Sequence, residues 1–150
     1  PRHIQRTKDI VNQIKELGLN VQTRSLGKKI NKNTDIYLVD TYGETSSFYK
    51  ICRNVFLGGS IINHGGQNPL EPARFGCKIL HGPNIQNFTE IYKLLNEENL
   101  SFKFYNSGQL IKSINKTLNG SANSLEKVNK LKKRGFNILN RTLTEINSFL

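Results

Sequence analysis

Apolar positions along the chain alternate between helical and strand-like spacing, and this alternation predicts an α/β fold. Apolar residues recur every three or four positions across 5–17, which predicts a helix. Compact apolar runs at 36–39, 55–57 and 78–80 predict short strands. The other predicted elements are strands at 20–25 and 100–105, and helices beginning at Thr41 and Asn68, at 88–95, at 107–118 and from 124. Strands that alternate with helices form right-handed βαβ crossovers, so we predict a parallel sheet covered by helices on both faces.

The first candidate binding segment is Asp-Thr-Tyr-Gly-Glu at 40–44, directly after the predicted strand at 36–39. Ligands of parallel sheets bind at the carboxyl ends of strands. The Thr-x-x-Glu spacing matches a capping box, in which Thr41 caps a helix and Glu44 reaches back to the amide of Thr41. Gly43 would let a ligand approach the backbone closely. The alternative interpretation is an ordinary helix start, which the local pattern alone favours.

The second candidate segment follows the predicted strand at 55–57 and contains two glycine pairs, Gly58-Gly59 and Gly65-Gly66. It leads into a helix with Asn68 at the cap, Pro69 at the first helical position and Glu71 at the third. Helix N-terminal amides attract a phosphate or a carboxylate, and Glu71 can accept two hydrogen bonds from a ribose diol. A well-capped helix after a flexible turn is the alternative interpretation.

The net charge of +11 leaves three classes of partner open. The basic surface could be solvated, or it could attract an anionic lipid or sugar phosphate, or it could bind nucleic acid. The charges are scattered apart from 28–29 and a cluster within 127–134, and no aromatic-rich RNA motif or zinc-finger spacing accompanies them. Nucleic-acid binding is therefore the last of the three.

Other side chains offer little catalytic chemistry. Cys52 and Cys77 are interpreted as two buried free thiols of a reducing cytoplasm. His64 and His81 lack partners at ligand spacing, so we expect surface or loop histidines and no metal site. No apolar run approaches the roughly 20 residues of a membrane span. The sequence begins at Pro1 and contains no Met, which we interpret as a fragment.

Five segments together resemble the C-terminal domain of the 3-deoxy-D-manno-octulosonic acid (Kdo) transferases, the lipid A glycosyltransferases of Gram-negative bacteria. The segments are Pro-Arg-His at 1–3, Asp-Thr-Tyr-Gly-Glu at 40–44, Gly-Gly-Ser at 58–60, Gly-Gly-Gln-Asn-Pro-Leu-Glu-Pro at 65–72, and Gly-Pro at 82–83 with Asn-Phe at 87–88. The resemblance implies a GT-B architecture of two Rossmann-like domains. Residues 1–150 would be the C-terminal, donor-binding domain, and the acceptor site and the catalytic base would lie in an N-terminal domain absent from this chain.

The same resemblance implies that the chain binds CMP-Kdo. Arg2 would face the phosphate of CMP and Glu71 the ribose hydroxyls. The implied nucleotide contacts are Pro1, Arg2, Tyr42, Gly43, Glu44, Asn68, Pro69, Leu70 and Glu71, and the further phosphate or sugar contacts are Gly59, Ser60, Gly65, Gly66 and Gln67. Gln67 stands where many members carry His, and Tyr42 stands where Met is common.

The family would transfer Kdo with inversion to the lipid A precursor, lipid IVA, at the cytoplasmic face of the bacterial inner membrane. The resemblance implies transfer without a metal, and a helix N-terminus and Arg2 would then stabilise the departing phosphate. Peripheral contact with the anionic membrane is a further expectation. The alternatives are another GT-B transferase or epimerase that uses a UDP-sugar, and then a basic nucleic-acid-binding module.

Overall fold

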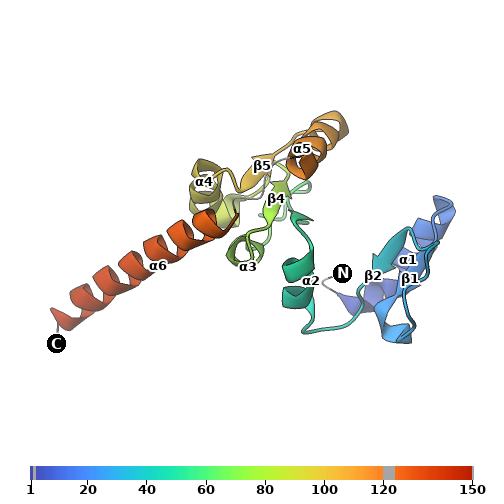
Figure 1. Cartoon of the computed structure of the whole chain (residues 1–150), viewed down its shortest axis with the longest axis horizontal. Coiled ribbons are helices and arrows are strands. Elements are labelled where there is room, and N and C mark those ends of the chain that lie inside the picture. Colours follow the sequence, from blue (N-terminus) through green and yellow to red (C-terminus); the bar gives the residue numbers. More distant parts are fainter. Residues whose placement is uncertain (2, 120–123, 150) are drawn as a thin grey trace. The chain divides into compact units, whose positions relative to one another are not determined.

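The computed structural model describes residue 1, residues 3–119 and residues 124–149. The chain forms two compact units, Pro1–Thr45 and Ser46–Leu150. Each unit has its own parallel sheet (Figure 1).

The first unit is a small parallel pair of strands preceded by a helix. Its elements in chain order are η1 (Ile4–Arg6), α1 (Thr7–Glu16), β1 (Val21–Thr23), η2 (Arg24–Leu26) and β2 (Ile36–Leu38). Ile14, on the apolar side of α1, is buried. The predicted strand at 20–25 is shorter than expected, because the chain turns into η2 at Arg24.

The second unit contains a three-stranded sheet in the order β3-β4-β5, with every pairing parallel. Its elements are α2 (Thr45–Ile51), β3 (Asn54–Phe56), α3 (Leu70–Arg74), β4 (Lys78–His81), η3 (Gln86–Phe88), α4 (Thr89–Glu97), β5 (Ser101–Lys103), α5 (Ser107–Asn119) and α6 (Ser124–Asn147). α2 begins at the last residue of the first unit. The prediction of parallel strands with intervening helices is confirmed, although the strands divide between two sheets.

Helices cover both faces of the three-stranded sheet. One face carries the main core, which consists of Leu57, Ala73, Ile79, Tyr92, Leu95 and Leu100. Successive side chains of a strand point to opposite faces, so Lys78 and Leu80 face away from Ile79. On that second face the Lys78 ammonium donates to the carbonyl oxygen of Thr117 in α5 at 2.9 Å. The central strand β4 is thereby enclosed.

Burial within this unit corrects two predictions about single side chains. His81 is buried in β4, with its ring 4.3 Å from that of Tyr92 between centroids, and it is no surface or loop residue. Burial lowers its pKa. His64 is exposed, as predicted. Both cysteines are free, but only Cys77 is buried, which raises its pKa to about 11, whereas Cys52 is exposed.

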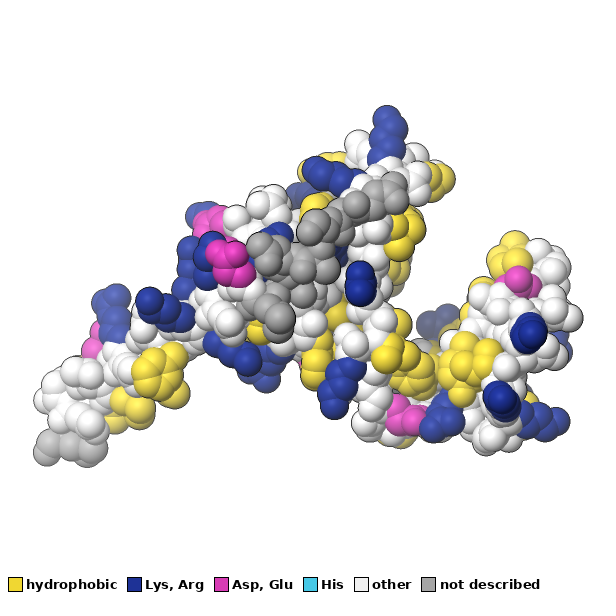
Figure 2. Space-filling model, in the orientation of Figure 1, with side chains coloured by type: hydrophobic (Ala, Val, Ile, Leu, Met, Phe, Trp, Pro, Cys, Tyr) yellow, Lys and Arg dark blue, Asp and Glu magenta, His cyan; other side chains and the backbone are white. Residues whose placement is uncertain are grey.

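The terminal helix packs along only part of its length. Val128 is buried and Leu131 packs partly against the core. The later apolar residues of α6 are exposed: Phe136, Leu139, Leu143 and Ile146. Figure 2 shows apolar side chains on the surface of this helix, with Lys and Arg side chains spread over the face in view. In the described part of the chain, no helix is long and apolar enough to cross a membrane. Residues 120–123, between the helices predicted at 107–118 and from 124, lie outside the described residues.

Candidate functional site

The segment 40–44 forms an irregular turn between β2 and α2, at the carboxyl end of β2. Gly43 has a φ of 81°, a conformation that side chains with a Cβ rarely adopt. A Cβ built on Gly43 would meet no atom within 4 Å. The side chain of Tyr42 is 68% exposed. The backbone of the turn around Gly43 is therefore open to solvent.

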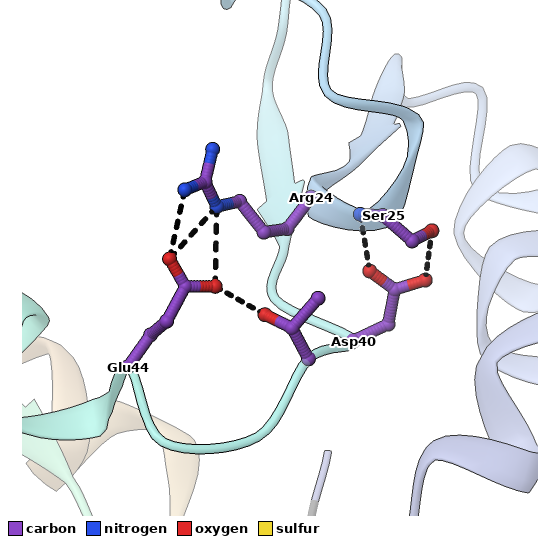
Figure 3. Close-up of polar contacts among 5 residues, drawn as sticks. Arg24, Ser25, Asp40 and Glu44 are labelled. Atoms are coloured by element: carbon purple, nitrogen blue, oxygen red, sulfur yellow. Dashed lines mark hydrogen bonds and ion pairs between the residues drawn. The ribbon is translucent and has the colours of Figure 1, made fainter.

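The predicted capping box is wrong. α2 begins at Thr45, so Thr41 is not its cap. The hydroxyl of Thr41 instead donates to the carboxylate of Glu44. The same carboxylate accepts from Arg24, with Nε at 3.0 and 3.1 Å from the two oxygens and Nη2 at 2.8 Å from Oε1 (Figure 3). A guanidinium that meets a carboxylate with two nitrogens forms a stronger bond than a single backbone amide, and Glu44 consequently faces Arg24.

Asp40 anchors the other end of the turn. One of its carboxylate oxygens accepts from the backbone amide of Ser25 at 2.8 Å and the other from the Ser25 hydroxyl at 2.6 Å. The Ser25 hydroxyl is the main reason why the pKa of Asp40 is lowered, and the hydrogen bond from the Ser25 backbone amide contributes. The hydrogen bonds from Arg24 and Thr41 lower the pKa of Glu44. Both carboxylates are therefore held in their charged form.

In the second unit, the glycine-rich loop after β3 is fixed by hydrogen bonds to the segment that follows β4. Ser60 is fully buried, donates to the Leu57 carbonyl oxygen at 2.7 Å and accepts from the Gly82 amide at 2.9 Å. The carbonyl oxygen of Ser60 accepts from the amide of Asn84 at 2.9 Å, and that of Gly65 from the amide of Asn87 at 3.2 Å. The loop is thus ordered along its length.

In this region Gly82 is required by a close contact with backbone, and Gly65 is required by its backbone conformation. A Cβ on Gly82 would lie 2.3 Å from the carbonyl oxygen of Ser60. Gly65 has a φ of 87°, and its Cβ would lie 2.2 Å from Nδ2 of Asn87. The sequence attributed Gly65 to ligand approach and gave no role to Gly82 or Asn87. The only sequence signal for the packing role of these residues was that they belong to the segments that carry the family resemblance.

The helix after the loop begins one residue later than predicted. α3 starts at Leu70 and Pro69 takes the cap position, so Glu71 is the second helical residue. Asn68 still serves the predicted purpose, because its Oδ1 accepts from the Leu70 amide at 3.0 Å. The Gln67 carbonyl oxygen accepts from the hydroxyl of buried Tyr92 at 3.3 Å. Asn68 and Glu71 are both exposed, and their side chains can reach a ligand in solution.

The structure therefore brings the predicted residues together in two groups. Within the first unit, Tyr42, Gly43 and Glu44 share one turn. Within the second unit, residues 59–71 form one ordered loop and helix start. Arg2 lies outside the described residues. Over 1, 3–119 and 124–149, no group of three or more His, Cys, Asp or Glu side chains is placed to hold a metal ion.

Comparison with known proteins places this architecture among the glycosyltransferases. No family profile matches the chain. It is 37% identical over 97 residues to the 3-deoxy-D-manno-octulosonic acid transferase of Haemophilus influenzae, covering 65% of this chain and 23% of that protein. The Rickettsia prowazekii transferase is 33% identical over 121 residues, 81% of this chain and 26% of the relative. The Aquifex aeolicus transferase is 25% identical over all 150 residues.

A solved structure gives the same result. The C-terminal CMP-Kdo binding domain of WaaA from Acinetobacter baumannii superposes with a TM-score of 0.78 at 28% identity, covering 89% of this chain and 69% of that one. The fold is that of the C-terminal half of a GT-B glycosyltransferase. The chain is a homologue of the 3-deoxy-D-manno-octulosonic acid transferases and matches a C-terminal CMP-Kdo binding domain in structure, as its motifs suggested. It spans about a quarter of the length of the first two relatives.

Proposed function

We propose that this chain binds the nucleotide donor CMP-Kdo for a glycosyltransferase that transfers Kdo. The observation that carries the proposal is the superposition on a CMP-Kdo binding domain across 89% of the chain. The ordered glycine-rich loop and the accessible turn at 40–44 lie at carboxyl ends of parallel strands, where ligands of such sheets bind.

Glu71 and Asn68 are the polar side chains that we assign to nucleotide contact in the second unit. Both are exposed at the start of α3. The carboxylate of Glu71 has the chemistry to accept from two neighbouring hydroxyls of a ribose. In the first unit we assign the backbone of Tyr42 and Gly43, which the open space around Gly43 leaves accessible. We retain Pro1 and Arg2 as further contacts on the family resemblance.

We further propose that the full-length protein transfers Kdo to the lipid A precursor, lipid IVA, at the cytoplasmic face of the inner membrane. In this proposal the catalytic base belongs to an N-terminal domain, and the departing CMP phosphate is stabilised without a metal. The net charge of +11 supports peripheral contact with an anionic membrane.

An NMR titration of this chain with CMP, UMP and ADP tests donor binding. We expect shifts at Gly43–Glu44 and Gly66–Glu71 with CMP alone, at an affinity of about 1 mM because part of the cleft is absent. Preference for UMP would favour the alternative of a UDP-sugar enzyme. The absence of shifts with all three nucleotides would count against donor binding by this chain.

The substitution Glu71→Ala tests the assigned contact. We expect about tenfold weaker CMP binding, since a charge-assisted hydrogen bond to the ribose is lost, with the fold retained. Glu90→Ala is the matched control, because Glu90 is also an exposed glutamate in the first turn of a helix, α4. Global loss of circular dichroism in the Glu71 variant would show a structural role and remove this contact from the proposal.

A further inference from the structure

Arg24 was not singled out by the sequence, yet it makes the strongest polar contact of the 40–44 turn. It comes from η2, twenty positions before its partner Glu44. Three nitrogen–oxygen distances of 2.8 to 3.1 Å join the two side chains. The next residue, Ser25, binds Asp40 through its amide and its hydroxyl. Two consecutive residues of η2 therefore hold both ends of the turn (Figure 3).

The charge of Glu44 presents a difficulty for the proposed ligand. CMP carries a phosphate that is close to doubly negative at neutral pH. An uncompensated carboxylate in a turn that contacts the nucleotide would repel that phosphate. Glu44 is not free to act alone, because its oxygens already accept from Arg24 and from the Thr41 hydroxyl. The Arg24 guanidinium cancels the carboxylate charge at the turn itself.

We infer that Arg24 is a positioning residue that fixes the 40–44 turn and neutralises Glu44, so that the turn accepts a phosphate-bearing nucleotide. The inference rests on the proposed function, since it takes CMP as the ligand. It assigns Glu44 to the structure of the turn, and it leaves ligand contact to the backbone around Gly43. The side chain of Arg24 is 43% exposed and that of Glu44 is 30% exposed, so the pair lies where a dissolved nucleotide can approach it.

The test compares CMP with cytidine, the same nucleoside without the phosphate, on four forms of this chain. The forms are the wild type, Arg24→Gln, Arg24→Lys and Arg141→Gln. Arg141 is the matched control, because it is also an exposed arginine paired with a glutamate, Glu145, at 3.0 Å in α6. Dissociation constants come from NMR titration, and the amide spectrum of each variant reports whether the turn keeps its structure.

We expect Arg24→Gln to weaken CMP binding about tenfold, as an uncompensated charge at moderate distance would. Cytidine binding should change less than about twofold, because cytidine carries no phosphate charge for Glu44 to repel. Arg24→Lys keeps the charge and should recover most of the CMP affinity. Arg141→Gln should change the affinity for neither CMP nor cytidine. If the Gln variant does not fold, the Lys variant still tests the inference. A loss of CMP affinity of about tenfold in Arg24→Lys, which keeps the positive charge, would contradict the role of Arg24 in neutralising Glu44.

Two results would overturn the inference alone: wild-type CMP binding that is unchanged in Arg24→Gln, or equal losses of CMP and cytidine, which would reduce Arg24 to a purely structural role. No CMP binding by the wild type would overturn the proposed function and this inference with it. The two failures are therefore distinguishable in the same experiment.

Discussion

Two loops that the sequence marked as equivalent candidate sites are built by different physical means. The turn at 40–44 is held by charged and hydroxyl side chains at the surface, chiefly Arg24 with Glu44 and Ser25 with Asp40. The loop at 58–67 is held by backbone hydrogen bonds, by buried Ser60 and by glycines that leave no room for a Cβ. The first loop should respond to charge and pH, and the second to side-chain volume.

The largest expected effect is that of Gly82→Ala. Its Cβ would overlap the backbone of Ser60, which cannot move without breaking the loop, so we expect a loss of about 3 kcal/mol in local stability. Native-state hydrogen exchange at the Ile79 amide in β4 measures it, since local exchange needs no two-state unfolding of both units. Gly58→Ala is the control, because a Cβ there meets nothing within 4 Å. Equal effects of the two variants would refute the steric explanation.

Ser60→Ala should have the next largest effect, a loss of about 2 kcal/mol in local stability, because it leaves the buried amide of Gly82 without its acceptor. The same exchange measurement applies. Ser47→Ala, at an exposed position of α2, is the matched control and should be close to neutral. A neutral Ser60→Ala would mean that the loop does not depend on this hydroxyl.

Gly43→Ala should cost about 1 kcal/mol in the first unit, from backbone strain alone, because space for a Cβ is available but the φ of 81° is unfavourable. Exchange at the Ile36 amide, which donates to the Asn20 carbonyl oxygen, reports it. Gly135→Ala within α6 should have the opposite sign, since alanine favours a helix and a Cβ there meets nothing within 4 Å. A stabilising Gly43→Ala would contradict the assigned conformation.

The smallest effect is a pH dependence confined to the first unit. The pKa values of Asp40 and Glu44 are lowered in the folded chain, so their stabilising contribution is complete above the unfolded values of about 4. It is lost as the pH falls through the folded values. Exchange rates in β1 and β2 should therefore rise on acidification, and Asp40→Asn should reduce this rise. An equal rise in β4, whose loop lacks such carboxylate bonds, would contradict the comparison.

Local pattern was enough to predict most elements, because apolar spacing reflects burial directly. The strands at 36–39, 55–57 and 78–80 and the helix at 107–118 match β2, β3, β4 and α5 within a residue or two. The capping-box prediction was wrong because it considered only neighbouring residues. In the folded chain the carboxylate of Glu44 accepts hydrogen bonds from Arg24, which is distant in the sequence. His81 was misjudged because its burial depends on helices that lie elsewhere in the sequence.

The sequence by itself determined the α/β order, the two glycine-rich loops and the family resemblance, since motif residues and their separations are properties of the chain alone. Tertiary structure decided which partner each site residue takes. Arg24 and Glu44 are twenty positions apart, and Ser60 and Gly82 are twenty-two. Contacts over such separations exist only after the parallel strands have paired, because pairing brings together the loops that follow them. The sequence alone cannot distinguish a glycine that is required because a Cβ would clash from one that is required because of a positive φ. The folded structure shows the difference.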